Sequence, residues 1–71
     1  MILQESYSDW YHKAGDIMFN SKTEMHYLLL EKIPTDLSSW TALEMESGEI
    51  YTIYGIGKTE YQRDTYWFKI A

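Results

Sequence analysis

The 71-residue sequence contains no cysteine, and this absence excludes two common ways of stabilising a small domain. Chains of this size often depend on disulfide bonds or on a structural metal. Without cysteine, neither a disulfide scaffold nor a thiolate zinc site can form. The absence also fits a reducing compartment, so we expect a cytoplasmic protein.

Long apolar runs and basic residues are scarce as well. The longest apolar run covers residues 27–30, whereas a membrane helix needs about 20 such residues, and residues 1–5 lack the basic start of a signal peptide. Six basic residues against eleven acidic ones give a net charge of -5, which opposes binding to nucleic acid. We therefore expect a soluble, unprocessed protein that binds neither membranes nor nucleic acids.

Aromatic side chains are abundant instead. Three Trp, seven Tyr and two Phe make up 17% of the chain. A chain near this length buries only about 60% of the surface that its unfolded form exposes, and each large ring can bury about 150 to 250 Å². The rings therefore replace disulfides as the source of a core, which we expect to belong to a single domain over residues 1–71.

Residues 40–54 are predicted to form the central β-hairpin. Two runs rich in aromatic and β-branched residues flank Ser47-Gly48, and glycine supplies the positive φ that a tight turn needs. A two-residue loop would place Leu43 opposite Thr52, whereas a three-residue loop with a bulge would place Leu43 opposite Tyr51. The sequence leaves both registers open.

The chain before Gly15 is predicted to form a short helix. Apolar residues recur there at the spacing of one helix face, and Gly15 would be the C-cap residue. A shorter turn that begins at Ser8 or Asp9 and an extended arm remain the alternatives. The residues of the helical stripe are Leu3, Tyr7, Trp10, Tyr11 and Ala14.

From Asp16 onward the apolar pattern is that of β-strands. Residues 16–20, 25–32 and 64–71 are predicted strands, and residues 34–39 and 55–63 are predicted loops. The strand over residues 25–32 is apolar on both faces, which is typical of a central strand. The core positions that we expect are Ile17, Phe19, Leu28, Leu30, Leu43, Ile53, Tyr66 and Phe68.

Five strands in so short a chain favour one sheet curled into a barrel, because curling covers one face and hides the edges. Gly15-Asp16 before the first strand, the apolar second strand and the hairpin of residues 40–54 resemble SH3-like barrels that begin with a Gly-Asp pair. Small proteins of this kind occur among the products of tailed phages, including cyanophages. The resemblance spans residues 15–71. It implies a five-stranded antiparallel SH3-like barrel and a phage accessory protein that acts in the host cytoplasm.

No motif in the sequence indicates catalysis or a cofactor. Gly57-Lys58-Thr59 matches the end of a phosphate-binding loop, but Thr52 stands where that pattern requires glycine. His12 and His26 are the two histidines, and we expect both to be structural residues rather than metal ligands. No serine stands in the nucleophile turn of a hydrolase. We therefore expect no enzyme, no cofactor and no metal site.

The surplus of rings predicts an interaction surface. Alternation along the last strand places Tyr66 and Phe68 in the core and turns Trp67 outward. Tyr and Trp are enriched in protein interfaces, although the N-terminal segment could instead cover these rings within the molecule. We expect a non-enzymatic module that binds a protein partner or, alternatively, a structural domain that assembles as a homo-oligomer. The candidate partner-binding residues are Trp67, Tyr51, Trp10, Tyr11 and Tyr61.

Overall fold

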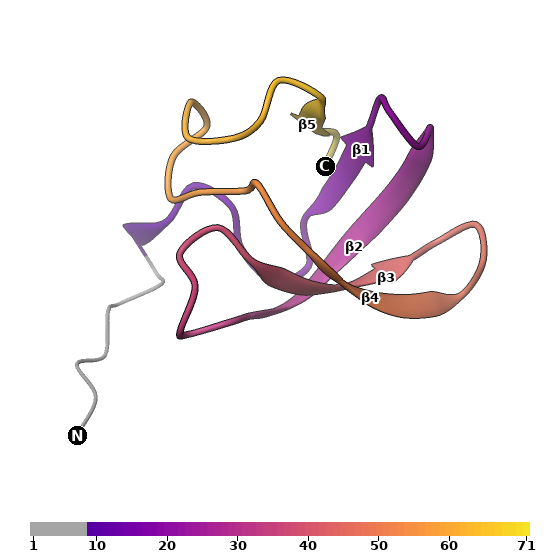
Figure 1. Ribbon diagram of the computed structural model, residues 1–71, viewed down its shortest axis with the longest axis horizontal. Helices are drawn as coiled ribbons and strands as arrows, with labels where there is room; N and C mark the ends of the chain where they lie inside the picture. The colour runs from indigo at the N-terminus through magenta and orange to yellow at the C-terminus, as the bar shows by residue number, and fades with distance from the viewer. Residues whose placement is uncertain (1–8) are drawn as a thin grey trace.

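The computed structural model describes residues 9–71, which form one antiparallel β-sheet. The first part of the predicted helical stripe, before residue 9, lies outside the described residues. The prediction of a mainly β fold with five antiparallel strands is confirmed. The strands are β1 (Ile17–Asn20), β2 (Met25–Lys32), β3 (Trp40–Glu44), β4 (Glu49–Ile53) and β5 (Trp67–Lys69) (Figure 1).

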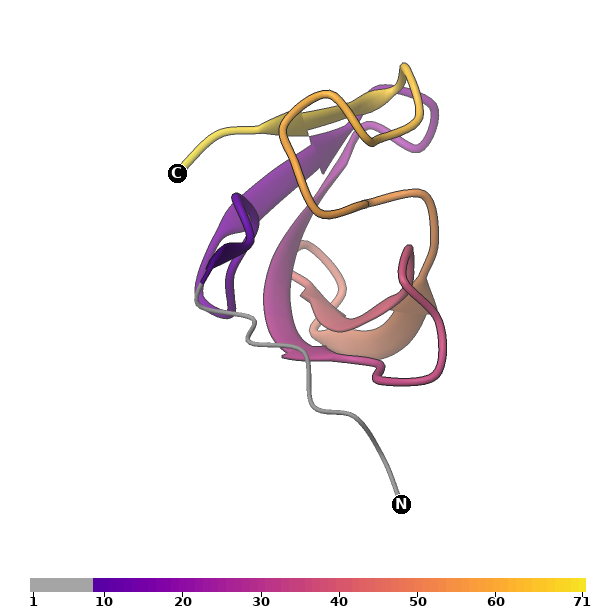
Figure 2. The same ribbon diagram turned by 90° about the vertical axis from the view of Figure 1, so that its left-hand side faces the viewer.

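The sheet has the strand order β4-β3-β2-β1-β5, so β2 is central, as its two apolar faces predicted. β2 pairs with β1 on one side and with β3 on the other. The register with β3 shifts between Leu29 and Glu31, and such a β-bulge bends the strand that carries it. Figure 2 shows the resulting curvature of the sheet. We call its concave side the inner face and its convex side the outer face.

The curved sheet is open. β4 and β5 are its two edges and are not paired with each other in the described part of the chain. Residues 54–66 connect them as a long loop that contains the isolated bridge between Ile56 and Arg63, and this loop arches over the concave side (Figure 2). β5 has only three residues, which pair with β1, and none of them pairs with β4. The predicted SH3-like barrel is therefore not confirmed.

The core lies on the inner face, and most of the predicted core positions are wrong by one residue. Ile53 is the one predicted position in the buried cluster, and Tyr66, also predicted, is partly buried and packs against it. Along β1, β2 and β5 the buried side chains are the immediate neighbours of those predicted, and a one-residue shift exchanges the two faces of a strand. The buried cluster consists of Met18, Tyr27, Leu29, Trp40, Ala42, Ile53, Ile56 and Trp67.

Trp67 shows why these side chains, rather than the neighbours that were predicted, form the core. The sequence placed its ring outside, yet only 2% of the residue is exposed. The ring packs edge-on against Tyr27, with 5.3 Å between the ring centroids, and the indole N–H donates a 2.8 Å hydrogen bond to the carbonyl oxygen of Tyr54. Burying the larger ring with its polar atom satisfied removes more apolar area from water than burying Phe68 would.

The segment from Trp10 to Asp16 contains no helix, so the helix prediction is wrong for this part of the chain. Trp10 and His12 are buried while Tyr11 is largely exposed, which is a period of two rather than the helical period. The backbone N–H groups of this segment donate to carbonyl oxygens outside it: that of Tyr11 donates to Lys58, and that of Gly15 to Leu29 of β2. These long-range partners replace the bonds that a helix would have made within itself.

The hairpin between β3 and β4 has neither of the two predicted registers. Leu43 faces Ile50 and Glu44 faces Glu49, so the loop contains four residues. Gly48 N–H donates to the carbonyl oxygen of Glu44 at 2.8 Å, and Gly48 has a φ of 77°, which favours glycine. The pairing of two carboxylates is tolerated because each accepts a phenolic hydrogen bond, Glu44 from Tyr27 and Glu49 from Tyr51.

Candidate interaction surfaces

A continuous row of aliphatic side chains crosses the outer face of the sheet. Leu28 of β2 lies opposite Ile17 of β1 and Leu43 of β3, and Leu43 lies opposite Ile50 of β4. On β5, Ile70 follows the last paired residue, and its N–H donates a 2.8 Å hydrogen bond to the carbonyl oxygen of Ile17. Directly paired residues of an antiparallel sheet project from the same face. The row therefore runs without interruption over β4, β3, β2 and β1 to Ile70, the residue that follows β5.

A second row, mainly aromatic, lies beside the first. Phe19 of β1 is paired with Phe68 of β5 and with His26 of β2. The centroids of the Phe19 and His26 rings are 5.0 Å apart. Leu30 adds a further apolar side chain on β2, on the side opposite to the buried Leu29. We call this surface the outer apolar face; it consists of Ile17, Phe19, Leu28, Leu30, Leu43, Ile50, Phe68 and Ile70.

The outer apolar face is open to solvent at its ends and half-buried in its middle. Ile50 is 62% exposed, Ile70 58% and Phe68 42%, whereas Leu28 and Leu43 are shielded in part by their neighbours. Among residues 9–71, no segment of the chain packs over it in the way that the loop of residues 54–66 covers the inner face. An apolar row that crosses a sheet in this way is unusual for a soluble monomer.

Charged groups lie beside this surface at several points, among them Glu31 of β2 and Arg63, whose guanidinium is 5.1 Å from the Phe68 ring. His26 Nδ1 lies 2.6 Å from a carboxylate oxygen of Glu46, and the backbone N–H of His26 donates to the other oxygen at 2.8 Å. These two hydrogen bonds from His26, the side-chain one first, hold the pKa of Glu46 below its ordinary value. The eight residues of the outer apolar face are themselves uncharged.

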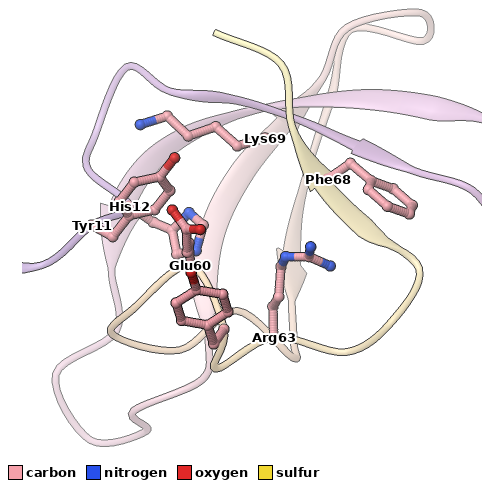
Figure 3. A pocket seen from close by; sticks show the side chains of 7 residues that line it. Tyr11, His12, Glu60, Arg63, Phe68 and Lys69 are labelled. Atoms are coloured by element: carbon pink, nitrogen blue, oxygen red, sulfur yellow. The ribbon is translucent and has the colours of Figure 1, made fainter.

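A shallow cavity of about 200 Å³ lies between the segment before β1, the long loop and β5 (Figure 3). Lys69 turns toward Tyr11, with Nζ 4.4 Å from the ring centroid, and also lies 3.2 Å from a carboxylate oxygen of Asp16. The Arg63 guanidinium lies 5.1 Å from the ring of Phe68. Ligand pockets usually measure about 300 Å³ or more. The lining residues are Tyr11, His12, Glu60, Tyr61, Arg63, Phe68 and Lys69.

His12 is the buried titratable group of this cavity. It is 1% exposed, and burial lowers the pKa of the imidazole, while the backbone carbonyl of Thr59 opposes this change and the positive charge of Lys69 adds to it. The ring is therefore held neutral. The cations of this cavity already contact other groups, Lys69 the carboxylate of Asp16 and the ring of Tyr11, and Arg63 the ring of Phe68.

The five predicted partner-binding residues do not form one surface. Trp67 and Trp10 are both buried, so the outward placement predicted for Trp67 is wrong. Tyr11 and Tyr61 are exposed and lie together at the cavity, whereas Tyr51 is on β4, with its hydroxyl donating to Glu49. The predicted surface was a cluster of Trp and Tyr. The apolar surface that the structure exposes is instead the outer apolar face, which consists of aliphatic residues and Phe.

Six of the eight residues of the outer apolar face, all except Ile50 and Ile70, were expected in the core from the sequence. The signal that could have identified them is the presence of a second apolar set on the same strands, with a Trp or Tyr at the alternate positions of β2, β3 and β5. When two sets compete, the set with the larger rings buries more area. The remaining set then becomes the surface.

Other kinds of site have no support in the described residues. Among residues 9–71, no three His, Asp or Glu side chains are grouped so that they could hold a metal ion. The same residues include no helix that is long and apolar enough to cross a membrane. Residues 57–59 lie in the long loop, with no helix after them. No protein-family model, curated protein or solved structure matches the chain.

Proposed function

We propose that this protein is a non-enzymatic protein–protein interaction module and that the outer apolar face is its binding surface. The observation that carries the proposal is the unbroken row from Ile50 through Leu28 to Ile70, which crosses β4 to β1, reaches the residue after β5 and is open to solvent at both ends. Apolar surface of this extent is stabilised when another surface covers it, by about 25 cal/mol for each Å² removed from water.

Two kinds of partner fit a module of this type. The resemblance of residues 15–71 to small tailed-phage proteins supports an accessory role, in which the partner is a host protein. The second candidate function is self-assembly, and the absence of charge on the outer apolar face favours it, since such a surface is complementary to a copy of itself.

The proposal is tested by placing charge on the surface without disturbing the core. The Ile50→Glu/Ile70→Glu double variant changes two of the most exposed residues at opposite ends of the row. The Leu37→Glu/Tyr61→Glu variant adds the same charge at exposed apolar residues that lie outside the outer apolar face. We expect the first variant to lose association with any protein, itself included, by at least about 2 kcal/mol, as for interface hot spots.

The matched variant should associate like the wild type, and both variants should keep their melting temperature within a few degrees. Association would be measured by immobilising each variant, exposing it to extract from the native source and, separately, to purified wild-type protein. Equal binding by both variants would show that the outer apolar face is not the binding surface.

A further inference from the structure

We infer that the free edge of β4 is a further binding site, at which an extended basic segment of another protein adds to the sheet as an additional strand. The inference goes beyond the proposed function, because backbone groups at the edge of the sheet make this contact and the outer apolar face does not. It rests on the direction of the backbone groups of β4 and on the side chains that flank them.

The hydrogen bonds of β3 show which way its backbone groups point. Met45 N–H donates a 2.8 Å hydrogen bond to the carbonyl oxygen of His26, so Met45 points toward the side of β2. Successive residues of a strand point to opposite sides, and Glu44 therefore points toward β4. In agreement with this direction, the carbonyl oxygen of Glu44 accepts a hydrogen bond from Gly48, and Glu44 is paired with Glu49.

Ile50 and Thr52 point away from the sheet, because they alternate with Glu49, which faces β3. Tyr54 continues the same alternation, and its carbonyl oxygen is bonded outside the sheet, to the indole of Trp67. Among residues 9–71, nothing bonds to the backbone N–H and C=O groups of Ile50 and Thr52. Open backbone donors and acceptors along an edge are a template for a further strand.

β4 lacks the features that usually protect an edge strand. Its five residues include no proline and no lysine, and its pairing with β3 has no bulge. Its first four residues are exposed. At the other edge, β5 has only three residues, and the N–H of Trp67 already donates to the carbonyl oxygen of Asp64. β4 is therefore the edge that is open to strand addition.

The side chains along β4 indicate the composition of the added strand. Glu49 lies opposite Glu44, and each carboxylate accepts a hydrogen bond from a tyrosine. Among residues 9–71, neither carboxylate forms an ion pair. On the other side of the strand, Ile50 is 62% exposed. Neighbouring side chains on adjacent strands share a face, so the geometry fits a segment in which basic and apolar residues alternate.

The net charge of -5 also favours a basic occupant. An acidic strand, such as β4 of a second copy of this chain, would be repelled by the whole molecule. A segment that carries Lys or Arg is attracted by it, and the attraction weakens as salt is added.

The probe is a synthetic peptide in which Lys and Val alternate, of the same length as β4. Amide hydrogen exchange followed by NMR locates the contact. At saturating peptide we expect exchange at the N–H groups of Ile50 and Thr52 to slow by at least about tenfold, with little change at Tyr51, which faces β3. A peptide with Glu in place of Lys should bind at least about tenfold more weakly.

Thr52→Pro removes one outward N–H and no bond of the ladder between β3 and β4, and proline is tolerated where the N–H of an edge strand faces solvent. We expect it to weaken peptide binding by at least about tenfold. Thr52→Val keeps the N–H and the shape of the side chain, and it should stay within about threefold of the wild type. Circular dichroism melting shows whether each variant is folded.

A test on the unaltered protein uses methylated peptides. Methylating the backbone nitrogens at alternate peptide residues removes the donors on one side of the peptide, and methylating the other set removes those on the opposite side. We expect one set to abolish binding to wild-type protein and the other set to leave it within about threefold.

Three results would overturn the inference. The first is unchanged exchange at Ile50 and Thr52 with about 5 mM peptide. The second is equal binding of the two methylated peptides, or equal binding by folded Thr52→Pro and Thr52→Val. The third is loss of peptide binding in Ile70→Glu, at the far end of the outer apolar face, because the peptide would then lie on that face. This third result would support the proposed function, so the two proposals can fail separately.

Discussion

The two faces of the sheet are built from similar amounts of apolar residue, yet one is a core and the other a surface. Trp40 and Trp67 on the inner face are each 2% exposed, whereas Ile50 and Ile70 on the outer face are more than half exposed. The difference comes from what lies over each face. The loop of residues 54–66 arches over the concave side and bonds to Trp67, and no described segment covers the convex side.

The comparison teaches that the core of a single-sheet protein is determined by its connections as much as by its strands. A sheet with two apolar faces can bury only one of them with a chain of this length. The face that is buried carries the large rings, of which Trp67 and Tyr27 have their polar atoms hydrogen-bonded, to Tyr54 and Glu44. The face that is left carries aliphatic residues and Phe, which need no polar partner and are suited to a second molecule.

The largest expected effect distinguishes two neighbouring residues of β5. Trp67→Ala should lower the free energy of unfolding by about 3 to 5 kcal/mol, because a buried ring is replaced by a cavity. Phe68→Ala, one residue later and on the outer face, should cost about 1 kcal/mol or less in the monomer. Urea denaturation at low protein concentration measures both. Similar losses would show that the two faces contribute equally to the core.

Alternation along the strands could not have distinguished these faces from the sequence. The positions of the five strands and the central place of β2 follow from local composition, and they are confirmed. The assignment of side chains to the inner or the outer face does not follow from local composition. Residues 25–32 are apolar at both even and odd positions, so either register would bury a plausible set of side chains. Tyr27 and Leu29, rather than Leu28 and Leu30, face the core because Trp40 and Trp67 lie on that side. These contacts join residues that are far apart in the sequence, so a local pattern does not show them.

A second expected effect concerns the buried amine of Lys32, at the end of β2. Its Nζ donates to the backbone carbonyls of Ile33, Asp36 and Ser39 and lies 4.9 Å from the ring of Trp10. Lys32→Met should therefore lower the free energy of unfolding by about 1 to 3 kcal/mol, since buried carbonyl oxygens lose their donor.

Lys22 provides the control for that substitution. It also lies over an aromatic ring, 4.8 Å from the centroid of Tyr66, but it is exposed. Lys22→Met should change stability by no more than about 0.5 kcal/mol, as for other surface substitutions. If the two variants were equally stable, the amine of Lys32 would not be what holds the loop of residues 33–39 to the core.

The conformations of the loops and of the N-terminal segment were the hardest to predict from the sequence, because they too depend on contacts between residues far apart in the chain. Residues 10–16 have the spacing of a helix face, but their backbone partners are Lys58 and Leu29, which lie far away along the chain. A local pattern cannot include such bonds. The candidate surface could not be predicted from the sequence for a related reason. The outer apolar face can be identified only once it is known which residues occupy the inner face.

The smallest expected effect is a pH dependence from His12, which is buried against the long loop that covers the inner face. Because burial lowers its pKa from an ordinary value of 6.5, the unfolded chain binds a proton that the folded chain does not. Stability is then fully present above about pH 6.5 and falls as the pH drops from there toward the folded pKa, by at most about 1.4 kcal/mol per pH unit.

His12→Phe should remove this slope, since phenylalanine fills the same space and does not titrate. His26→Gln should retain it, because His26 lies on the other side of the sheet, at the border of the outer apolar face, where it pairs with Glu46. Denaturation midpoints between pH 5 and pH 8 measure the slope. If the slope of stability against pH disappeared in His26→Gln and persisted in His12→Phe, the titrating group would be His26 rather than His12. Burial of His12 under the loop of residues 54–66 would then not be the cause of the pH dependence.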